Sequence, residues 1–344
     1  MKRIITSRVW QMGALAGVVT AAAIFFALFI DFDLVWHELR GADWRWLLVA
    51  VFALLLSLIC YAVRWRILLG NKPSFGFTFH ASNIGHGVNT IVPLRAGEVA
   101  RIALMGSEAE AKVSYTEAVS SYVVERMFEQ VMRLVAFGTA VALGAGGVAT
   151  ESALLAVITP LSLAFLALLW LYLHQERVRT RWPKKLAKLP YITESFAQRS
   201  INGFLHNLNA ASSPRQLTQI FLWSGLTWFW AAVYHVLVLA AVPHLFPRES
   251  WLPIALAALA LCPPSATTQP IIFQTMLAPI SLAGYSGSAI FAYAILLNAS
   301  QLVVMNLLGL LGLTRIGFSL QALRGLLGQR EEVRELVREQ KRAE

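Results

Sequence analysis

Charged residues are scarce in this chain of 344 residues. Asp, Glu, Lys and Arg make up 14% of it, whereas hydrophobic residues make up 57%. Soluble proteins carry about 25% charged residues. The deficit excludes a soluble cytoplasmic enzyme, a coiled coil and a disordered protein. Cysteine is also rare: Cys60 and Cys262 both lie in or beside apolar runs, so we expect no disulfide framework.

Motifs for familiar chemistry are missing as well. The sequence has no phosphate-binding P-loop and no dinucleotide fingerprint, and its seven histidines do not pair with carboxylates at metal-site spacing. The longest polar stretch, 174–215, is too short and too basic for a catalytic domain. We therefore expect no enzyme, no cofactor and no metal. The net charge of +10 is confined to segments between or beyond apolar runs, which indicates membrane orientation rather than nucleic-acid binding.

Long apolar runs dominate what is present. A membrane-spanning helix needs about 20 mostly apolar residues, and the first run is too long for a cleavable signal sequence, so we interpret it as a retained span. The sequence predicts six spans: Met12–Ile30, Trp46–Tyr61, Ala118–Leu143, Ser152–Leu173, Gln216–Ala241 and Tyr285–Leu313.

Basic residues predict the orientation. They occur at the N-terminus, after the second span (Arg64, Arg66 and Lys72), in the loop 174–215 and at the C-terminus. Placing these segments in the cytoplasm satisfies the positive-inside rule. We expect a multi-pass protein of the cytoplasmic (inner) membrane with both termini in the cytoplasm.

Two further apolar stretches, Phe75–Arg101 and Trp251–Gly284, are interrupted by Gly, Pro and polar residues. Each must return to the side that it left, so each is predicted as a re-entrant hairpin. The expected fold is all-α, with six transmembrane helices and two re-entrant hairpins in two inverted repeats, 1–150 and 151–315. The tail, 316–344, has the periodicity of a cytoplasmic amphipathic helix.

The first interrupted stretch holds the most informative polar residues. Asn89, Pro93 and Gly97 break a helix, and the break frees backbone groups that lipid does not tolerate unless protein or a wet cavity satisfies them. Arg95, Glu98 and Arg101 lie at the break. The alternative is a cytoplasmic loop whose charges meet water.

The third span supplies a second polar group. Glu125, Arg126, Glu129 and Arg133 fall within one sector of about 100° on a helix. Each unpaired charge costs roughly 2.5–3.5 kcal/mol at a membrane centre, so these residues should face partners or water. Two interpretations stay open and can coexist: an ion-pair network that locks the helices, and a site where arginine exchanges a carboxylate for a lipid phosphate.

These residues carry a family resemblance. The pattern Asn-x3-Pro-x-Arg-x-Gly-Glu-x2-Arg at Asn89–Arg101, followed by Glu125-Arg126, resembles the transmembrane region of lysylphosphatidylglycerol synthases and its stand-alone, flippase-like relatives. The resemblance covers nearly the whole chain. It implies a lipid-translocating domain with inverted repeats, in which Asn89, Pro93, Arg95, Gly97, Glu98, Arg101, Glu125 and Arg126 occupy the motif positions.

The second half departs from that pattern. Where the family tends to have glycines and a terminal acid, this chain reads Pro264 to Gln274 without glycine and ends in an amide. Its polar residues are uncharged, which suggests an altered substrate or coupling ion; they are Thr267, Thr268, Gln269 and Gln274. The synthases transfer the aminoacyl group in an additional soluble domain that this chain lacks, so we do not expect a synthase.

We therefore expect a transporter that moves an anionic phospholipid, a polyprenyl-phosphate-linked lipid or another headgroup-bearing lipid between leaflets. The alternative is a non-transporting membrane subunit that positions a lipid-modifying enzyme or glycosyltransferase, docked through the loop 174–215 or the tail. The sequence does not predict the lipid, the energy source or the oligomeric state.

Overall fold

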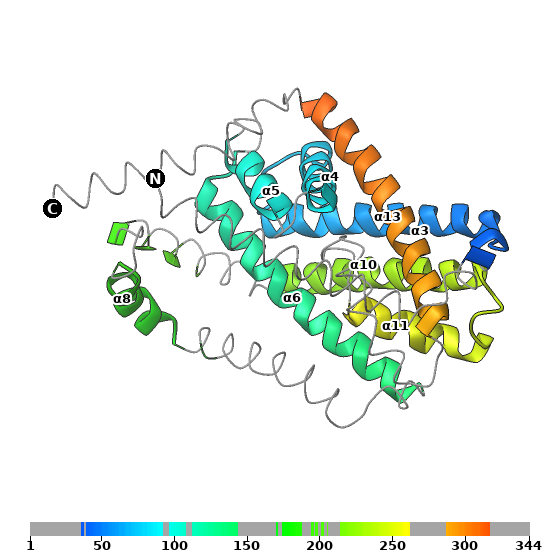
Figure 1. Ribbon diagram of the computed structural model, residues 1–344. Coiled ribbons are helices and arrows are strands. Elements are labelled where there is room, and N and C mark those ends of the chain that lie inside the picture. Colours follow the sequence, from blue (N-terminus) through cyan, green and yellow to red (C-terminus); the bar gives the residue numbers. More distant parts are fainter. Residues whose placement is uncertain are drawn as a thin grey trace, which may run out of the picture.

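In the computed structural model, every regular element of the described residues is a helix (Figure 1). The structure describes residues 36–37, 39–91, 96–107, 112–143, 170, 174–187, 194–195, 197–198, 201–202, 205, 214–261 and 287–316. The helices are α3 (Trp44–Leu68), α4 (Phe75–Ile91), α5 (Ala96–Ser107), α6 (Tyr115–Ala142), α8 (Gln175–Leu186), α10 (Pro214–Ala241), the 3-10 turn η3 (Arg248–Ser250), α11 (Trp251–Leu261) and α13 (Gly287–Ile316).

Three of these helices, α3, α10 and α13, are both long and apolar enough to cross a bilayer. They correspond to the predicted second, fifth and sixth spans. The fourth described long helix, α6, has 28 residues and covers the predicted third span, but its charged residues set it apart from the three apolar helices. The first span, the fourth span apart from Trp170, and the tail 316–344 apart from Ile316 lie outside the described residues.

Helix α3 is longer than the sequence predicts. The side chain of Asp43 accepts a hydrogen bond from the Arg45 amide and caps the start, and the helix continues to Leu68 instead of ending near Tyr61. The segment that holds Arg64 is therefore part of the helix and not a connection beyond it. Arg64 lies inside the helix and is fully buried.

Helices α3 and α10 form an antiparallel pair along their whole length (Figure 1). At one end the Asp43 amide donates to the Ala241 carbonyl at 2.9 Å, and at the other Gln216 Nε2 donates to the Ile67 carbonyl at 3.2 Å. Between them, the Ser57 hydroxyl donates to the carbonyl of Thr227 at 3.0 Å. The two halves of the sequence are thus joined through their central helices.

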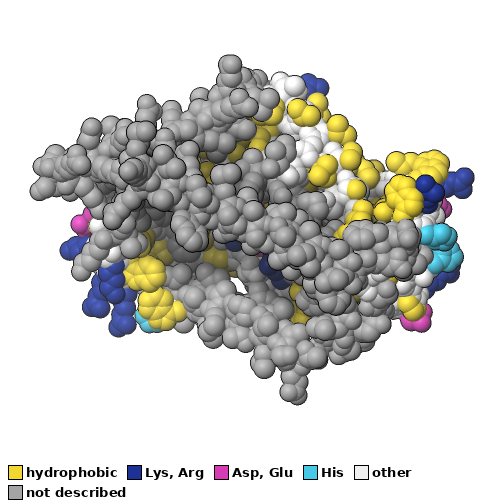
Figure 2. All heavy atoms as spheres, in the orientation of Figure 1, with side chains coloured by type: hydrophobic (Ala, Val, Ile, Leu, Met, Phe, Trp, Pro, Cys, Tyr) yellow, Lys and Arg dark blue, Asp and Glu magenta, His cyan; other side chains and the backbone are white. Residues whose placement is uncertain are grey.

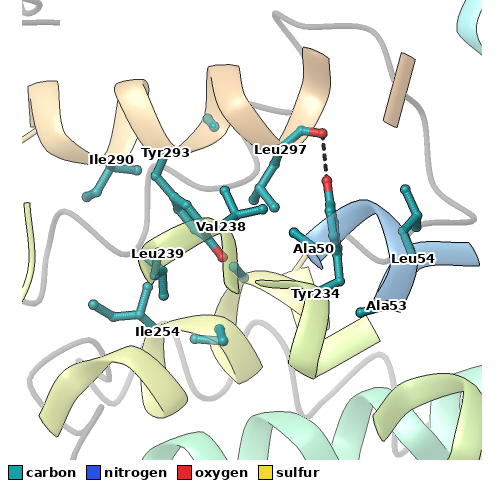
Figure 3. Packing of buried hydrophobic residues seen from close by; sticks show 14 of the residues in the cluster. Ala50, Ala53, Leu54, Tyr234, Val238, Leu239, Ile254, Ile290, Tyr293 and Leu297 are labelled. Atoms are coloured by element: carbon teal, nitrogen blue, oxygen red, sulfur yellow. Dashed lines mark hydrogen bonds between the residues drawn. The ribbon is translucent and has the colours of Figure 1, made fainter. Parts of the chain in front are cut away.

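Alanine, leucine and tyrosine side chains fill the space between α3, α10, α11 and α13. Figure 3 shows this core, with Tyr234 and Tyr293 between the helices and Ala50 and Ala53 facing α10. The small alanines let helix backbones approach closely, which favours dispersion contacts where lipid supplies no hydrophobic driving force. Tyr234 satisfies its hydroxyl by donating to the Leu297 carbonyl at 2.9 Å.

The predicted first hairpin contains two helices, α4 and α5, which pack against each other. With 17 and 12 residues they span about 26 and 18 Å at 1.5 Å per residue, so neither crosses a hydrocarbon core of about 30 Å alone. Helix α4 also packs against α13, where Gly309 and Gly312 bring the backbones together. The predicted second hairpin is described only as far as its first helix, α11.

Candidate functional site

A capping box fixes the start of α6, the helix that carries the charged face. The Ser114 hydroxyl accepts from the amide of Glu117, and the Glu117 carboxylate accepts from the amide of Ser114, which closes a capping box. From that start, a continuous helix places Glu125 and Glu129 one turn apart on the buried side. Of the sector predicted from the sequence, Glu125 and Glu129 are buried, and Arg126 and Arg133 are half-buried.

Glu125 lies at the centre of a buried network of ion pairs. Its Oε1 accepts a hydrogen bond from Arg64 Nη2 of α3 at 3.2 Å, and its Oε2 accepts one from Arg101 Nη2 of α5 at 3.0 Å. Arg126 Nη2 comes within 3.5 Å of Oε1. One carboxylate thus joins three arginines from three helices.

The other two carboxylates each bridge a pair of these arginines. Glu129 accepts from Arg64 at 3.1 Å and from Arg126 at 2.6 Å. Glu98 pairs with Arg101 at 2.8 Å, one helical turn along α5, and with Arg126 at 3.3 Å. We call these six residues the Arg–Glu network: Arg64, Glu98, Arg101, Glu125, Arg126 and Glu129.

The Arg–Glu network is balanced in charge and almost completely buried. Three arginines face three glutamates, and the side chain of Arg126, 15% exposed, has the greatest contact with the surroundings. Balanced pairing offsets the desolvation of each ion, which otherwise costs several kcal/mol. Removing any one member leaves a buried charge without its counterpart.

Aromatic rings form part of the wall around the arginines. The Arg101 guanidinium lies 4.6 Å from the Trp65 ring centroid and 5.1 Å from that of Tyr122, and the Arg64 guanidinium lies 4.9 Å from that of Tyr61. The Tyr61 hydroxyl also accepts hydrogen bonds from Arg101 and Arg126. These contacts stabilise cations in a site that excludes water.

Close contact between α4 and α5 brings Glu98 and Arg101 to α6. The Asn89 Oδ1 of α4 accepts from the Gly97 amide at 2.8 Å and so satisfies an amide in the first turn of α5. A Cβ at Gly97 would lie 2.7 Å from Asn89 Oδ1 and closer still to the Gly85 carbonyl. A Cβ at Gly85 would in turn meet the Arg101 side chain at 3.1 Å. Glycine is required at both positions.

The structure brings together most of the predicted first-half residues. Asn89, Gly97, Glu98, Arg101, Glu125, Arg126 and Glu129 lie in or beside the Arg–Glu network. Arg133 is half-buried one turn beyond Glu129 on α6. Pro93, Arg95, Thr267, Thr268, Gln269 and Gln274 lie outside the described residues, so their positions stay predictions.

Sequence reasoning missed two members of the site, Arg64 and Tyr61. Arg64 follows an apolar run and looked like an orientation signal. One signal could have found the pair: residues 61 and 64 share a helix face, which also carries the apolar Leu54 and Leu58 of the core. A polar continuation of a buried face indicates a buried polar partner.

Arg64 keeps unused donors in this closed environment. Its Nη2 serves both Glu125 and Glu129, whereas its Nε and Nη1 have no hydrogen-bond partner among the described residues. The side chain is 0% exposed. Buried donors without a partner are costly, so they favour an additional oxygen ligand at this point.

A second, uncharged polar cluster lies between α10 and α13. The Tyr234 hydroxyl contacts Ser300 Oγ at 2.7 Å, and His235 Nδ1 lies 2.8 Å from the Tyr293 hydroxyl. His235 is therefore a hydrogen-bonded core residue. The second half therefore contributes neutral hydrogen-bonding groups here, whereas the first half contributes the ions.

The comparisons agree with the motif at residues 89–101. The family described as the lysylphosphatidylglycerol synthase TM region matches residues 13–309 of the chain. No curated protein and no solved structure shows a significant match to the chain.

Proposed function

Because the chain belongs to the family of the lysylphosphatidylglycerol synthase TM region, we propose that this multi-pass membrane protein moves an anionic or headgroup-bearing lipid between leaflets. One observation carries the proposal: the buried Arg–Glu network joins the α4–α5 pair to two long helices. In this proposal the network binds the phosphate of the lipid headgroup during its passage.

Arginine suits this exchange for a geometric reason. Its planar guanidinium binds a carboxylate or a phosphate through the same pair of parallel N–H donors, and it keeps its charge when buried. A phosphate can therefore take the place of a glutamate without leaving the arginine unpaired. Such a replacement limits the desolvation cost that otherwise keeps a headgroup out of the membrane interior.

Arg126 is the proposed first contact for the headgroup. It is the most exposed member of the Arg–Glu network, and its pair with Glu98 is long, at 3.3 Å. Glu98 belongs to the short helix α5, which packs against α4 and α6. Separation of α5 from α6 would break the contact of Arg126 Nη2 with Glu98, so that Nη2 could bind phosphate while Nη1 stayed paired with Glu129.

Charge balance sets a further condition on the ligand. An anion entering a balanced network needs an additional positive charge or a proton on a carboxylate. Arg133, one turn beyond Glu129, brings the arginines of this region to four against three glutamates. In the proposal Arg133 and Arg95 supply the compensating charge, and the unused Arg64 donors bind a headgroup oxygen.

The packing supports two inverted repeats. If α3, the first hairpin and α6 correspond to α10, the second hairpin and α13, the helix contacts are reciprocal. Helix α3 packs on α10, α4 packs on α13, and α11 packs on α6. Helices α3 and α10 run antiparallel, as inversion requires (Figure 1). Transport would then proceed by alternate opening of the two hairpins around the α3–α10 pair.

A structural lock predicts the same ion pairs without transport, so the experiment has to separate the two. Purified protein is reconstituted into liposomes that contain a fluorescent phosphatidylglycerol. A membrane-impermeant reductant then destroys the fluorescence of labelled lipid in the outer leaflet. The assay is run with a pH gradient imposed in either direction. We expect wild type to move labelled lipid from the inner to the outer leaflet, where the reductant destroys the label. Arg126→Gln should slow exchange by about tenfold or more, since a charge-assisted hydrogen bond contributes about 1.5–3 kcal/mol.

The double variant Glu98→Gln/Arg126→Gln distinguishes the two roles. It removes one charge of each sign, so the remaining network stays balanced, and a lock would regain both thermal stability and function relative to Arg126→Gln alone. A phosphate site would regain stability without transport, because the cation is absent. Lys72→Gln, in an exposed ion pair with Glu117, is the matched control and should leave exchange unchanged. Equal exchange in wild type, Arg126→Gln and protein-free liposomes would reject transport.

A further inference from the structure

Helix α8 carries an exposed basic surface that plays no part in the Arg–Glu network. Its twelve residues include a single acid, Glu176, which is exposed and lies 3.7 Å from Arg179. The basic side chains are exposed and outnumber it; they are Arg177, Arg179, Arg181, Lys184 and Lys185. Their excess charge has no counterpart on the helix itself.

Tryptophan side chains extend this surface. The ring of Trp170 stacks on His174 with centroids 4.9 Å apart, and it lies 6.2 Å from the ring of Trp182. Both tryptophans are exposed, at 41% and 37%. An exposed indole beside basic residues is typical of the headgroup region, where one part of the ring contacts acyl chains and the N–H contacts water.

The opposite side of α8 is apolar and already covered. Val178 is buried with Ile201 and Leu205, and Leu186 packs against them. This small core fixes which side of α8 faces outward. Among the described residues α8 makes few contacts with the long helices, so its basic and aromatic side is left for another partner.

The position of α8 indicates what that partner is. It lies at the end of the molecule where α3 ends and where α6 and α10 begin (Figure 1). In Figure 2, Lys and Arg side chains gather at this end beside exposed hydrophobic groups. Helix α8 begins five residues after Trp170, which belongs to the predicted fourth span. It therefore begins close to the point where that span is predicted to leave the membrane.

We propose that α8, with Trp170 and His174, forms a binding surface for anionic lipid headgroups of the membrane that holds the protein. Lys and Arg near an anionic leaflet are attracted over about one Debye length, roughly 10 Å at 0.1 M salt. The indoles add contacts with the upper acyl chains. The surface recruits anionic lipid to the end of the bundle where α5 and α6 meet.

This inference does not depend on lipid transport. A protein that only binds or presents lipid would use the same surface, and a transporter could lose it without losing the Arg–Glu network. The distribution of charge also favours lipid over a protein partner. The five basic residues surround the exposed part of the helix, which suits a diffuse layer of headgroups.

The test uses the full chain in nanodiscs. Cys60 and Cys262 are replaced by alanine, and a nitroxide label is attached to Thr180→Cys on the exposed side of α8. Spectra are compared in phosphatidylcholine alone and in phosphatidylcholine mixed with phosphatidylglycerol. We expect the label to lose mobility in the anionic mixture, and we expect high salt to restore it.

Variants assign the effect to its groups. Arg181→Gln/Lys184→Gln/Lys185→Gln should abolish the difference between the two lipid mixtures. Trp182→Ala should weaken it, and Trp182→Phe should restore much of it. Lys72→Gln, an exposed basic residue outside α8, should change nothing. The same mobility in both mixtures, or immobilisation only by a co-purifying protein, would overturn the proposal.

Discussion

Glu125 is the member of the Arg–Glu network whose removal should lower the stability of the protein most. It accepts from Arg64, Arg101 and Arg126, and its side chain is 0% exposed. The substitution Glu125→Gln keeps the size of the side chain and removes the charge. Three buried arginines then face two carboxylates.

The expected cost follows from that imbalance. Breaking a buried ion pair by removing one partner costs about 3–5 kcal/mol, because the remaining charge stays desolvated. An exposed pair contributes about 0–1 kcal/mol. Lys72 and Glu117 form such a pair, with side chains 45% and 30% exposed, and Glu117→Gln keeps the capping box. Glu125→Gln should therefore destabilise the protein several times more than Glu117→Gln.

A double-mutant cycle isolates the pair itself. Arg64→Met removes the buried cation that Glu125 shares with Glu129, so Arg64→Met/Glu125→Gln restores the balance of charge. The double variant should be more stable than the sum of the single effects predicts, by about 1–3 kcal/mol. The free energy of unfolding is measured in detergent micelles for wild type, the two single variants and the double variant, by denaturant titration followed by circular dichroism. Additive effects, or a loss no larger than that of Glu117→Gln, would refute the reasoning.

Three further predictions concern the surroundings of the network. Gly97→Ala should destabilise the protein by about 1–3 kcal/mol in thermal unfolding, because its Cβ meets Asn89 and the Gly85 backbone. Gly138→Ala, at a position of α6 with open space around it, should stabilise the protein by up to about 1 kcal/mol in the same measurement. Tyr61→Phe removes the hydroxyl that accepts from two arginines and should cost about 1.5–3 kcal/mol by the same measurement. Burial raises the pKa of Glu117, but hydrogen bonds from Lys72 and Ser114 outweigh this and lower it overall. The stability from Glu117 is thus present above its unfolded pKa of about 4.3 and is lost as pH falls through the lower folded pKa, so the difference in melting temperature between wild type and Glu117→Gln should disappear in acid.

The charged face of α6 could be predicted because helical periodicity needs only one segment of sequence. Glu125, Arg126 and Glu129 lie on one side of any regular helix, and burial of that side follows from the cost of charge in lipid. The boundary between α4 and α5 was partly readable: α4 ends before Pro93 and α5 begins after it, and proline interrupts a helix for local reasons. Asn89 and Gly97 were wrongly predicted to break a helix, because they lie inside α4 and α5.

The partner of Arg64 could not be identified from its own segment. A basic residue after the largely apolar run 46–63 fits an orientation signal as well as a buried ion, and the choice depends on which helix lies opposite. That partner is α6, more than fifty residues away in the sequence. The pairing of α3 with α10 is hidden for the same reason, since small residues such as Ala50 and Ala53 indicate close packing without naming the partner.

Native mass spectrometry of lipids that co-purify with the full chain tests the central claim most directly, because it observes headgroup binding without requiring a cycle of transport. The comparison is made in the background Arg181→Gln/Lys184→Gln/Lys185→Gln, so that the α8 surface does not supply the bound lipid. The otherwise wild-type protein should retain an anionic phospholipid or polyprenyl phosphate, and Arg126→Gln should lose it while Lys72→Gln retains it. The same bound lipid in all three proteins, or only neutral lipid in the otherwise wild-type protein, would contradict a headgroup site in the Arg–Glu network.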